Sequence, residues 1–138
     1  MATLKSFEDI QAWQKARIIC QMIYAVSESG SFSKDFSLKD QISRASGSIM
    51  DNIAEGFERG GRKEFLQFLA IAKGSAGEVR SQLYRAFDRN HISKNDFESI
   101  SNLLLETSKM INGFMAYLNN TDIKGIKYIQ EPEMDYNK

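Results

Sequence analysis

The sequence predicts an all-α protein, folded as an antiparallel up-down bundle of four helices. Apolar residues recur at steps of three and four along four separate segments, which places each set on one face of a helix. The single proline, Pro132, lies near the end of the 138 residues, so no other proline interrupts a helix. With 42% hydrophobic and 26% charged residues, the composition is that of one globular domain.

The first helix is predicted over residues 7–27. Ser6 and Asp9 have the spacing of a capping box, in which a hydroxyl and a carboxylate accept hydrogen bonds from free amides of the first turn. The apolar face comprises Ala12, Ala16, Ile19, Ile23 and Val26. Residues 27–37, which contain Gly30 and several serines, are predicted to form a loop.

The second helix is predicted over residues 38–58, where Ser37 and Asp40 repeat the capping spacing. Its apolar face comprises Leu38, Ile42, Ala45, Ile49, Ile53 and Phe57. The pair Gly60-Gly61 follows, and glycine tolerates the positive φ angles that end a helix and begin a turn.

The third helix is predicted over residues 62–90 and the fourth over residues 94–118. Asn90-His91 separates them, and Ser93 with Asp96 has the spacing of another helix start. The apolar face of the third helix comprises Phe65, Phe68, Leu69, Ala72, Ala76, Val79, Leu83, Ala86 and Phe87. That of the fourth comprises Phe97, Ile100, Leu104, Thr107, Ile111, Phe114 and Leu118. Short links make neighbouring helices antiparallel.

Residues 1–118 are thus predicted to form the four-helix bundle, and residues 119–138 a C-terminal tail. The tail loses the helical periodicity and contains Gly125, Pro132 and several acidic residues. We expect it to be flexible or to dock on a partner.

Eighteen Lys and Arg residues balance eighteen Asp and Glu residues, which disfavours a strongly basic, non-specific coat for nucleic acid. The single cysteine, Cys20, cannot form an internal disulfide and is compatible with a reducing cytoplasm. No signal peptide and no transmembrane stretch is predicted. We expect a cytoplasmic protein without membrane contact.

No group of residues has the pattern of a catalytic or metal site. His91 is the single histidine and lies in a predicted turn, so the paired Glu-x-x-His ligands of di-metal bundles are missing. Cys20 falls on the apolar face of the first helix, where a small apolar role is expected. We predict a non-enzymatic protein with no catalytic residue, no bound metal and no small-molecule cofactor.

Polar residues recur along the second helix beside its apolar face, at Arg44, Ser48, Asn52 and Glu55. Two interpretations are open. One is a solvated flank with hydrogen bonds to neighbouring helices, and the other is a surface that binds a partner.

Positive charge gathers at the predicted turn, where Arg59, Arg62 and Lys63 flank the two glycines. Exposed glycines let a phosphate approach the backbone, and arginine offers a fork that matches it. Three further arginines follow along the third helix, at Arg80, Arg85 and Arg89. The competing interpretation of both groups is ordinary surface charge, since acidic residues lie among them.

Several stretches carry a resemblance to a known family. The most specific reads Ser-Ile-Met-Asp-Asn-Ile-Ala-Glu-Gly over residues 48–56 and is followed by Arg59. The others are residues 7–10, 13–17, 36–38, 41–45, 63–65, 68–69 and 71–75, with Glu78. Together they cover residues 7–118 and resemble the four-helix-bundle family of 23S rRNA intervening-sequence proteins. The family usually has Phe-Pro in the first loop, where this chain has Phe32-Ser33.

The resemblance implies a bacterial, cytoplasmic, up-down four-helix bundle with no catalytic activity. Members are sometimes encoded in inserts within large-subunit ribosomal RNA genes. Related bundles assemble as pentameric rings, and one relative, an accessory protein of diversity-generating retroelements, binds reverse transcriptase and RNA. The resemblance therefore implies a homo-oligomer, with a pentamer as the expected state.

We predict a homo-oligomeric scaffold that binds RNA or a ribonucleoprotein partner. The residues expected to contact nucleic acid are Arg59, Arg62 and Lys63, with Arg44, Arg80, Arg85 and Arg89 as further contributors. The alternative is a protein–protein interaction scaffold without nucleic-acid contact, which uses the polar face of the second helix or the tail.

Overall fold

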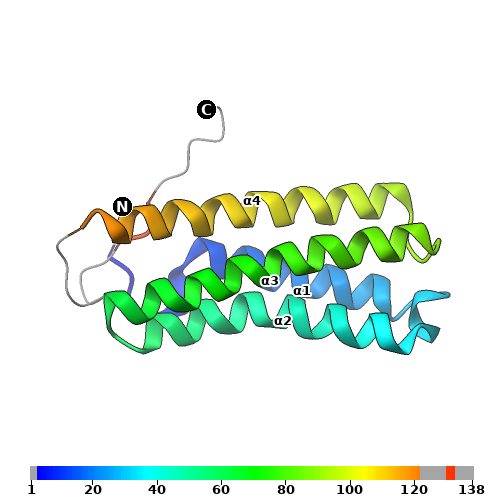
Figure 1. Ribbon diagram of the computed structural model, residues 1–138, viewed down its shortest axis with the longest axis horizontal. Helices are drawn as coiled ribbons and strands as arrows, with labels where there is room; N and C mark the ends of the chain where they lie inside the picture. Colours follow the sequence, from blue (N-terminus) through cyan, green and yellow to red (C-terminus); the bar gives the residue numbers. More distant parts are fainter. Residues whose placement is uncertain (1–2, 122–129, 133–138) are drawn as a thin grey trace.

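Four long helices lie side by side in a computed structural model that describes residues 3–121 and 130–132 (Figure 1). They are α1 (Gln11–Ser27), α2 (Phe36–Glu58), α3 (Arg62–Asp88) and α4 (Lys94–Asn119). Two short 3-10 helices, η1 (Phe7–Asp9) and η2 (Phe32–Lys34), precede α1 and α2. Every regular element within the described ranges is helical, which confirms the predicted all-α class. No helix among these residues is long and apolar enough to cross a membrane.

Contacts between helices show that consecutive helices run in opposite directions. The start of α2 meets the end of α3, where Asp35 pairs with Arg89. Further along, Ser48 of α2 bonds to Ser75 of α3. Glu28, just after the end of α1, pairs with Lys39 near the start of α2, and Arg62 at the start of α3 donates to the Leu118 carbonyl near the end of α4. The short connections between α2 and α3 and between α3 and α4 leave room only for this arrangement, as Figure 1 shows.

The core is the set of apolar faces that the periodicity predicts. Every residue of the predicted α2 face is buried, and so are most of those on the other three helices. Half-buried exceptions lie at the edges of the faces: Val26, Phe68, Phe87 and Phe97. Four buried apolar residues of the described chain come instead from segments outside the long helices, namely Leu4, Ile10, Phe32 and Ile92. Loops therefore close the core at its ends.

The first helix begins later than predicted. Asp9 does accept hydrogen bonds from the backbone amides of Lys5 and Ser6, at 2.9 and 3.2 Å, but the turn it stabilises is the 3-10 helix η1. Ile10 has an extended backbone, with φ −76° and ψ 119°, and this residue separates η1 from α1, which starts at Gln11. The capping pattern was correct, whereas the type of helix was wrong.

The predicted bounds of the second and third helices also need correction. Asp35, not Ser37, is the cap of α2, since its carboxylate accepts from the Leu38 amide at 3.4 Å. The helix α3 ends at Asp88 rather than residue 90, because Asn90 has a φ of 59°. Ser93 caps α4 as predicted, with its hydroxyl accepting from the Asp96 amide at 3.0 Å. The predicted 27–37 loop contains η2.

The antiparallel order gives the bundle two distinct ends. We call one the turn end: it holds the start of α1, the 59–62 turn between α2 and α3, and the end of α4. We call the other the histidine end: it holds the 28–35 loop and the 89–93 turn. The boundary predicted at residue 118 lies one residue before the end of α4. Most of the predicted tail lies outside the described residues.

Candidate nucleic-acid interface

The turn between α2 and α3 is built by its first glycine. Gly60 has a φ of 84°, a left-handed conformation that glycine adopts without strain. Gly61 returns to extended geometry and precedes the first residue of α3. No neighbouring atom lies within 4 Å of the place where a Cβ on Gly60 would stand, so its backbone is open to solvent. A phosphate could therefore approach the backbone here, as the sequence predicts.

Arg59 is the first of the three basic residues at this turn. Its guanidinium donates to Glu55 Oε1 at 2.8 Å, and its Cζ lies 5.2 Å from the ring centroid of Phe68. Both partners hold the side chain against the bundle, but more than half of it remains exposed. In this position Arg59 can turn an open edge toward a phosphate while the ring supports it.

Arg62 contacts the end of α4. Its Nη1 donates to the backbone carbonyls of Leu118 and Thr121, at 3.0 and 3.4 Å. The side chain thereby satisfies carbonyls at the C-terminus of α4, where the helix dipole favours a cation. Arg62 thus links the end of α4 to the start of α3. Its hydrogen bonds to these carbonyls compete with a contact between its guanidinium and nucleic acid.

Lys63 is exposed, and it makes no hydrogen bond or ion pair within the part of the chain that the structure describes. It lines a shallow hollow of about 340 Å³ with Gly61, Arg62 and Glu64. The carboxylate of Glu64 lies close to Gly61, where it reduces the positive potential of the turn. Lys63 is the trio's most available cation.

The other predicted basic residues lie elsewhere. Arg85 lies in the last turn of α3 and Arg89 directly follows that helix, which at 27 residues is roughly 40 Å long. Arg44, with its side chain 80% exposed, pairs with Asp40 in the first half of α2. Arg80 is half-buried. The seven residues therefore do not form one surface: Arg59, Arg62 and Lys63 lie at the turn, and Arg85 and Arg89 lie at the other end of the bundle.

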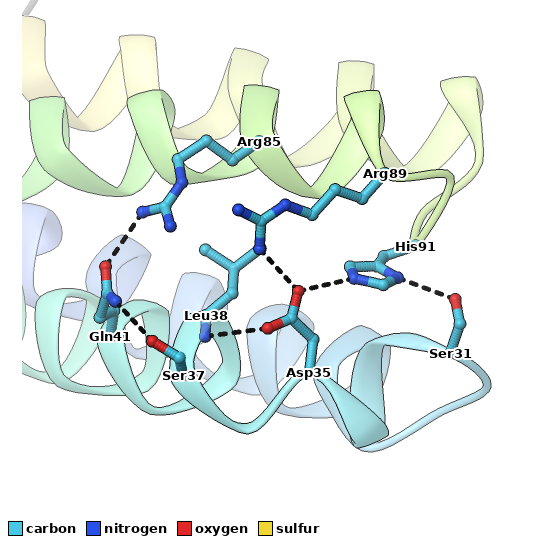
Figure 2. A network of polar contacts seen from close by, with 8 residues as sticks. All are labelled: Ser31, Asp35, Ser37, Leu38, Gln41, Arg85, Arg89 and His91. Atoms are coloured by element: carbon cyan, nitrogen blue, oxygen red, sulfur yellow. Dashed lines mark hydrogen bonds and ion pairs between the residues drawn. The ribbon is translucent and has the colours of Figure 1, made fainter.

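Arg85 and Arg89 form part of a polar network at the histidine end (Figure 2). Arg85 donates to Gln41 Oε1 at 3.0 Å, and Arg89 donates to Asp35 Oδ2 at 2.7 Å. Both arginines bridge from α3 to the first turns of α2, as the figure shows. Both guanidinium groups thus form hydrogen bonds within the protein.

His91 links Asp35 of this network to Ser31. Its Nε2 lies 2.9 Å from Asp35 Oδ2 and its Nδ1 lies 2.8 Å from Ser31 Oγ, with the ring stacked on Phe32. The side chain is only 11% exposed. The hydrogen bond from His91 and the bond from Arg89 lower the pKa of Asp35 from 3.8 to about 2. The chain Ser31–His91–Asp35 joins the first loop to the turn before α4.

The polar residues of α2 also serve the interior of the fold. Ser48 Oγ lies 2.8 Å from Ser75 Oγ of α3, and Asn52 donates to Ser48 at 2.8 and 2.9 Å. Gly56 continues this line: a Cβ there would stand 2.6 Å from Phe68 Cβ. Of the two interpretations, hydrogen bonding to a neighbouring helix is confirmed for Ser48. The motif at residues 48–56 is thus a close-packed seam between α2 and α3.

A groove between α1 and α2 was not predicted. It has a volume of about 480 Å³ and is lined by residues that include Cys20, Ser27, Lys39, Ser46 and Gly47. Two large aromatic side chains line it and remain exposed, Tyr24 at 69% and Phe36 at 76%. Burial raises the pKa of the Cys20 thiol, which disfavours the reactive thiolate. An isolated aromatic in a sequence gives no sign of its exposure, so this surface needed the structure.

Two capping carboxylates were likewise missed. Asp35 stands directly before the second apolar pattern, so a search for a capping residue could have found it. Glu131 accepts from the amides of Gln11 and Ala12, which are 120 and 119 positions away, and no local signal predicts this. Among residues 3–121 and 130–132, no group of three or more His, Cys, Asp or Glu side chains could hold a metal ion.

These observations define the class of protein first: a four-helix bundle in which polar side chains of α2 and α3 form hydrogen bonds from one helix to the other. The chain belongs to the family of 23S rRNA-intervening sequence proteins, whose sequence profile matches residues 8–113. The match runs from η1 into the last turns of α4 and confirms the resemblance of the motifs.

A solved structure with a similar fold comes from Bacteroides thetaiotaomicron VPI-5482. It is described as a protein with unknown function from the S23 ribosomal protein family. It is 26% identical, with a TM-score of 0.69, and the match covers 75% of this chain and 97% of that one. The comparison with curated proteins gave no match.

Proposed function

We propose that this chain is a non-enzymatic, homo-oligomeric scaffold that binds RNA or the RNA of a ribonucleoprotein through its turn end. One observation carries the proposal: Arg59 and Lys63 are exposed on either side of a glycine turn whose backbone is open. Arginine and lysine bind phosphate oxygens by charge-assisted hydrogen bonds. Arg62 positions the turn rather than contacting RNA, since carbonyls of the α4 terminus occupy it.

Binding at this site requires more than one copy of the turn. The chain has no net charge, and Glu55 and Glu64 lie next to the two cations. A single turn would therefore bind RNA weakly. In a symmetric assembly the same turn recurs on every subunit. Several weak contacts to one RNA molecule then raise the overall affinity by avidity. The pentamer that the family resemblance implies would supply five copies of the turn.

We assign the groove between α1 and α2 to contact with a second copy of this chain. Exposed aromatic residues beside a groove are typical of protein–protein interfaces, where they bury large areas. Tyr24 and Phe36 are the anchors in this proposal, and replacing both by serine should shift the protein from oligomer to monomer. Light scattering after size-exclusion chromatography measures this directly, and an unchanged mass would contradict the assignment.

The RNA-binding proposal is tested with a double variant at the turn and a matched control. Arg59→Ala with Lys63→Ala should weaken binding of a structured RNA and make it less dependent on salt, by about 0.7–0.9 in the log–log slope for each phosphate that is no longer neutralised. The control, Arg44→Ala with Lys94→Ala, removes the same charge from two other exposed positions. Equal weakening by both variants would show general electrostatic attraction and contradict the site.

The second candidate function is a protein–protein scaffold without nucleic-acid contact. The same groove favours it, because its exposed aromatics suit a protein surface. The polar face of α2 no longer supports it, since Ser48 and Asn52 are engaged within the chain. Purified oligomer that retains its mass but binds no RNA at low salt would favour this second function.

A further inference from the structure

The helix α1 begins without a cap from its own part of the chain. Ile10 precedes it and has no side-chain acceptor, and the first turn contains no acidic residue. The first amides of any helix need acceptors from outside the helix, and the helix dipole favours an anion there. Neighbouring helices show the usual local solution, with Asp35 at α2 and Ser93 at α4.

Glu131 supplies the missing acceptor from the far end of the chain. Its Oε1 accepts from the Gln11 amide at 2.5 Å, and its Oε2 accepts from the Ala12 amide at 3.1 Å. The residues on either side, Gln130 and Pro132, are partly buried as well. A segment of three residues near the C-terminus therefore closes on the start of α1.

This closure takes place at the turn end of the bundle. In Figure 1 the start of α1, the α2–α3 turn and the segment 130–132 share that end. The other described part of the tail is fastened there too, since Arg62 donates to the carbonyl of Thr121 at 3.4 Å. The tail thus brings a negative charge to the end of the molecule that carries Arg59 and Lys63.

The polar contact of Glu131 consists of two backbone amides. The two amides lower the pKa of Glu131, but burial outweighs them and the pKa is raised overall. Burial therefore weakens the binding of the charged carboxylate to the two amides. Asp35, the corresponding cap at the histidine end, has Arg89 and His91 beside it and a lowered pKa. Glu131 is held much less firmly.

We propose that Gln130–Pro132 is a reversible autoinhibitory latch on the turn end, closed by Glu131 on the start of α1 of the same chain. When closed, it sets a carboxylate against the phosphates of an approaching RNA. When RNA binds, repulsion between phosphates and carboxylate favours the open state. This inference rests on the proposed function, which places RNA at that end. Opening must precede binding, so the closed state reduces the apparent affinity.

The latch itself is tested without RNA, by residue-resolved hydrogen exchange of the full chain. Glu131→Ala should speed exchange at Gln11 and Ala12 about fivefold, the factor expected for a capping interaction of ordinary strength. Glu133→Ala removes the same charge two positions further on and is the matched control. Unchanged exchange in Glu131→Ala, or equal effects of both variants, would overturn the latch.

A mixing experiment distinguishes closure within one chain from exchange between copies. Isotope-labelled Glu131→Ala protein is mixed with an excess of unlabelled wild-type protein and allowed to reassemble. Closure within the chain predicts that Gln11 and Ala12 of the labelled variant remain fast. Restored protection would show that Glu131 of a second copy binds there and would overturn the assignment to the same chain.

RNA affinity then tests the regulatory part. Glu131→Ala should bind a structured RNA about fivefold tighter than the wild type, and the gain should exceed that of Glu133→Ala. Equal affinities for Glu131→Ala and Glu133→Ala would overturn the autoinhibition while leaving the proposed function intact. No binding by any of the three proteins would refute the proposed function and, with it, the regulatory part, whereas the exchange data would still report on closure.

Discussion

The two ends of the bundle each use a carboxylate to cap a helix, but they surround it differently. At the histidine end, Asp35 caps α2 and is also bound by Arg89 and His91, so its pKa falls to about 2. At the turn end, Glu131 caps α1 through two amides, and burial raises its pKa. Asp35 is held by two further side chains, whereas Glu131 is held by two backbone amides. In the proposed function, the less firmly held carboxylate lies at the end that binds the partner.

The largest effect is expected where α2 packs most closely on α3 near the turn end. Gly56→Ala places a Cβ 2.6 Å from Phe68 Cβ and 3.1 Å from Phe65, so the helices have to shift. We expect a loss of about 1–3 kcal/mol in the free energy of unfolding, measured in urea. The control is Gly47→Ala, whose Cβ meets nothing within 4 Å. It should stabilise α2 by about 0.5–1 kcal/mol. Similar results for both would contradict the close seam.

The next effect compares the two ends directly. His91→Ala removes the contacts to Ser31, Asp35 and the Phe32 ring, and should cost about 2 kcal/mol in unfolding free energy. Lys63→Ala, at the turn end, should change it by less than about 0.5 kcal/mol, since that side chain is exposed. Thermal and urea unfolding of both variants measure the contrast. Equal losses would mean that the two ends are not differently constructed.

Acid should affect the two caps with opposite sign. The folded pKa of Asp35 lies below the ordinary 3.8, so its stabilisation is full above that value and is lost as the pH falls to about 2. The gap in melting temperature between the wild type and Asp35→Asn should therefore narrow over this range. The pKa of Glu131 is raised, so its charged form costs stability, and this cost disappears on protonation. A pH-independent gap for Asp35→Asn would contradict the network.

The smallest expected effects concern two arginines, Arg62 and Arg44, whose contributions to stability could not be ordered from the sequence. Arg62→Ala removes the donor to the carbonyls of Leu118 and Thr121, and should lower the unfolding free energy by about 1 kcal/mol. Arg44→Ala breaks an exposed pair with Asp40 and should change it by about 0–0.5 kcal/mol. If Arg44→Ala proved the more harmful, the assignment of Arg62 as a fastening residue would be wrong.

Helix periodicity predicted most of the fold because burial in a bundle depends on one face of each helix. The apolar face of α2 is buried at every predicted position, and the turn at Gly60 forms where the glycine pair predicted it. Boundaries were less accurate, since several residues near a helix start can cap it. Asp35 caps α2 although Ser37 had the more familiar spacing, and Asp9 stabilises a 3-10 turn rather than an α-helix.

The candidate site could be predicted only in part. Proximity in sequence brought Arg59, Arg62 and Lys63 together, but it could not show that Arg62 is directed to the end of α4. Arg85 and Arg89 looked similar in the sequence, yet they lie at the opposite end and bind Gln41 and Asp35. Partners that lie in different helices, far apart along the chain, decide which charges remain available, and a linear pattern does not contain that information.

Hydrogen exchange with and without bound RNA tests the central claim, that the turn end is the binding end, most directly. The protein is exchanged with a saturating structured RNA, and protection is compared over residues 59–65 and over residues 89–93. We expect RNA to slow exchange around Gly60 and Lys63 and to leave His91 and its neighbours unchanged. Protection confined to residues 89–93, or absent from both segments of an RNA-bound protein, would contradict the account.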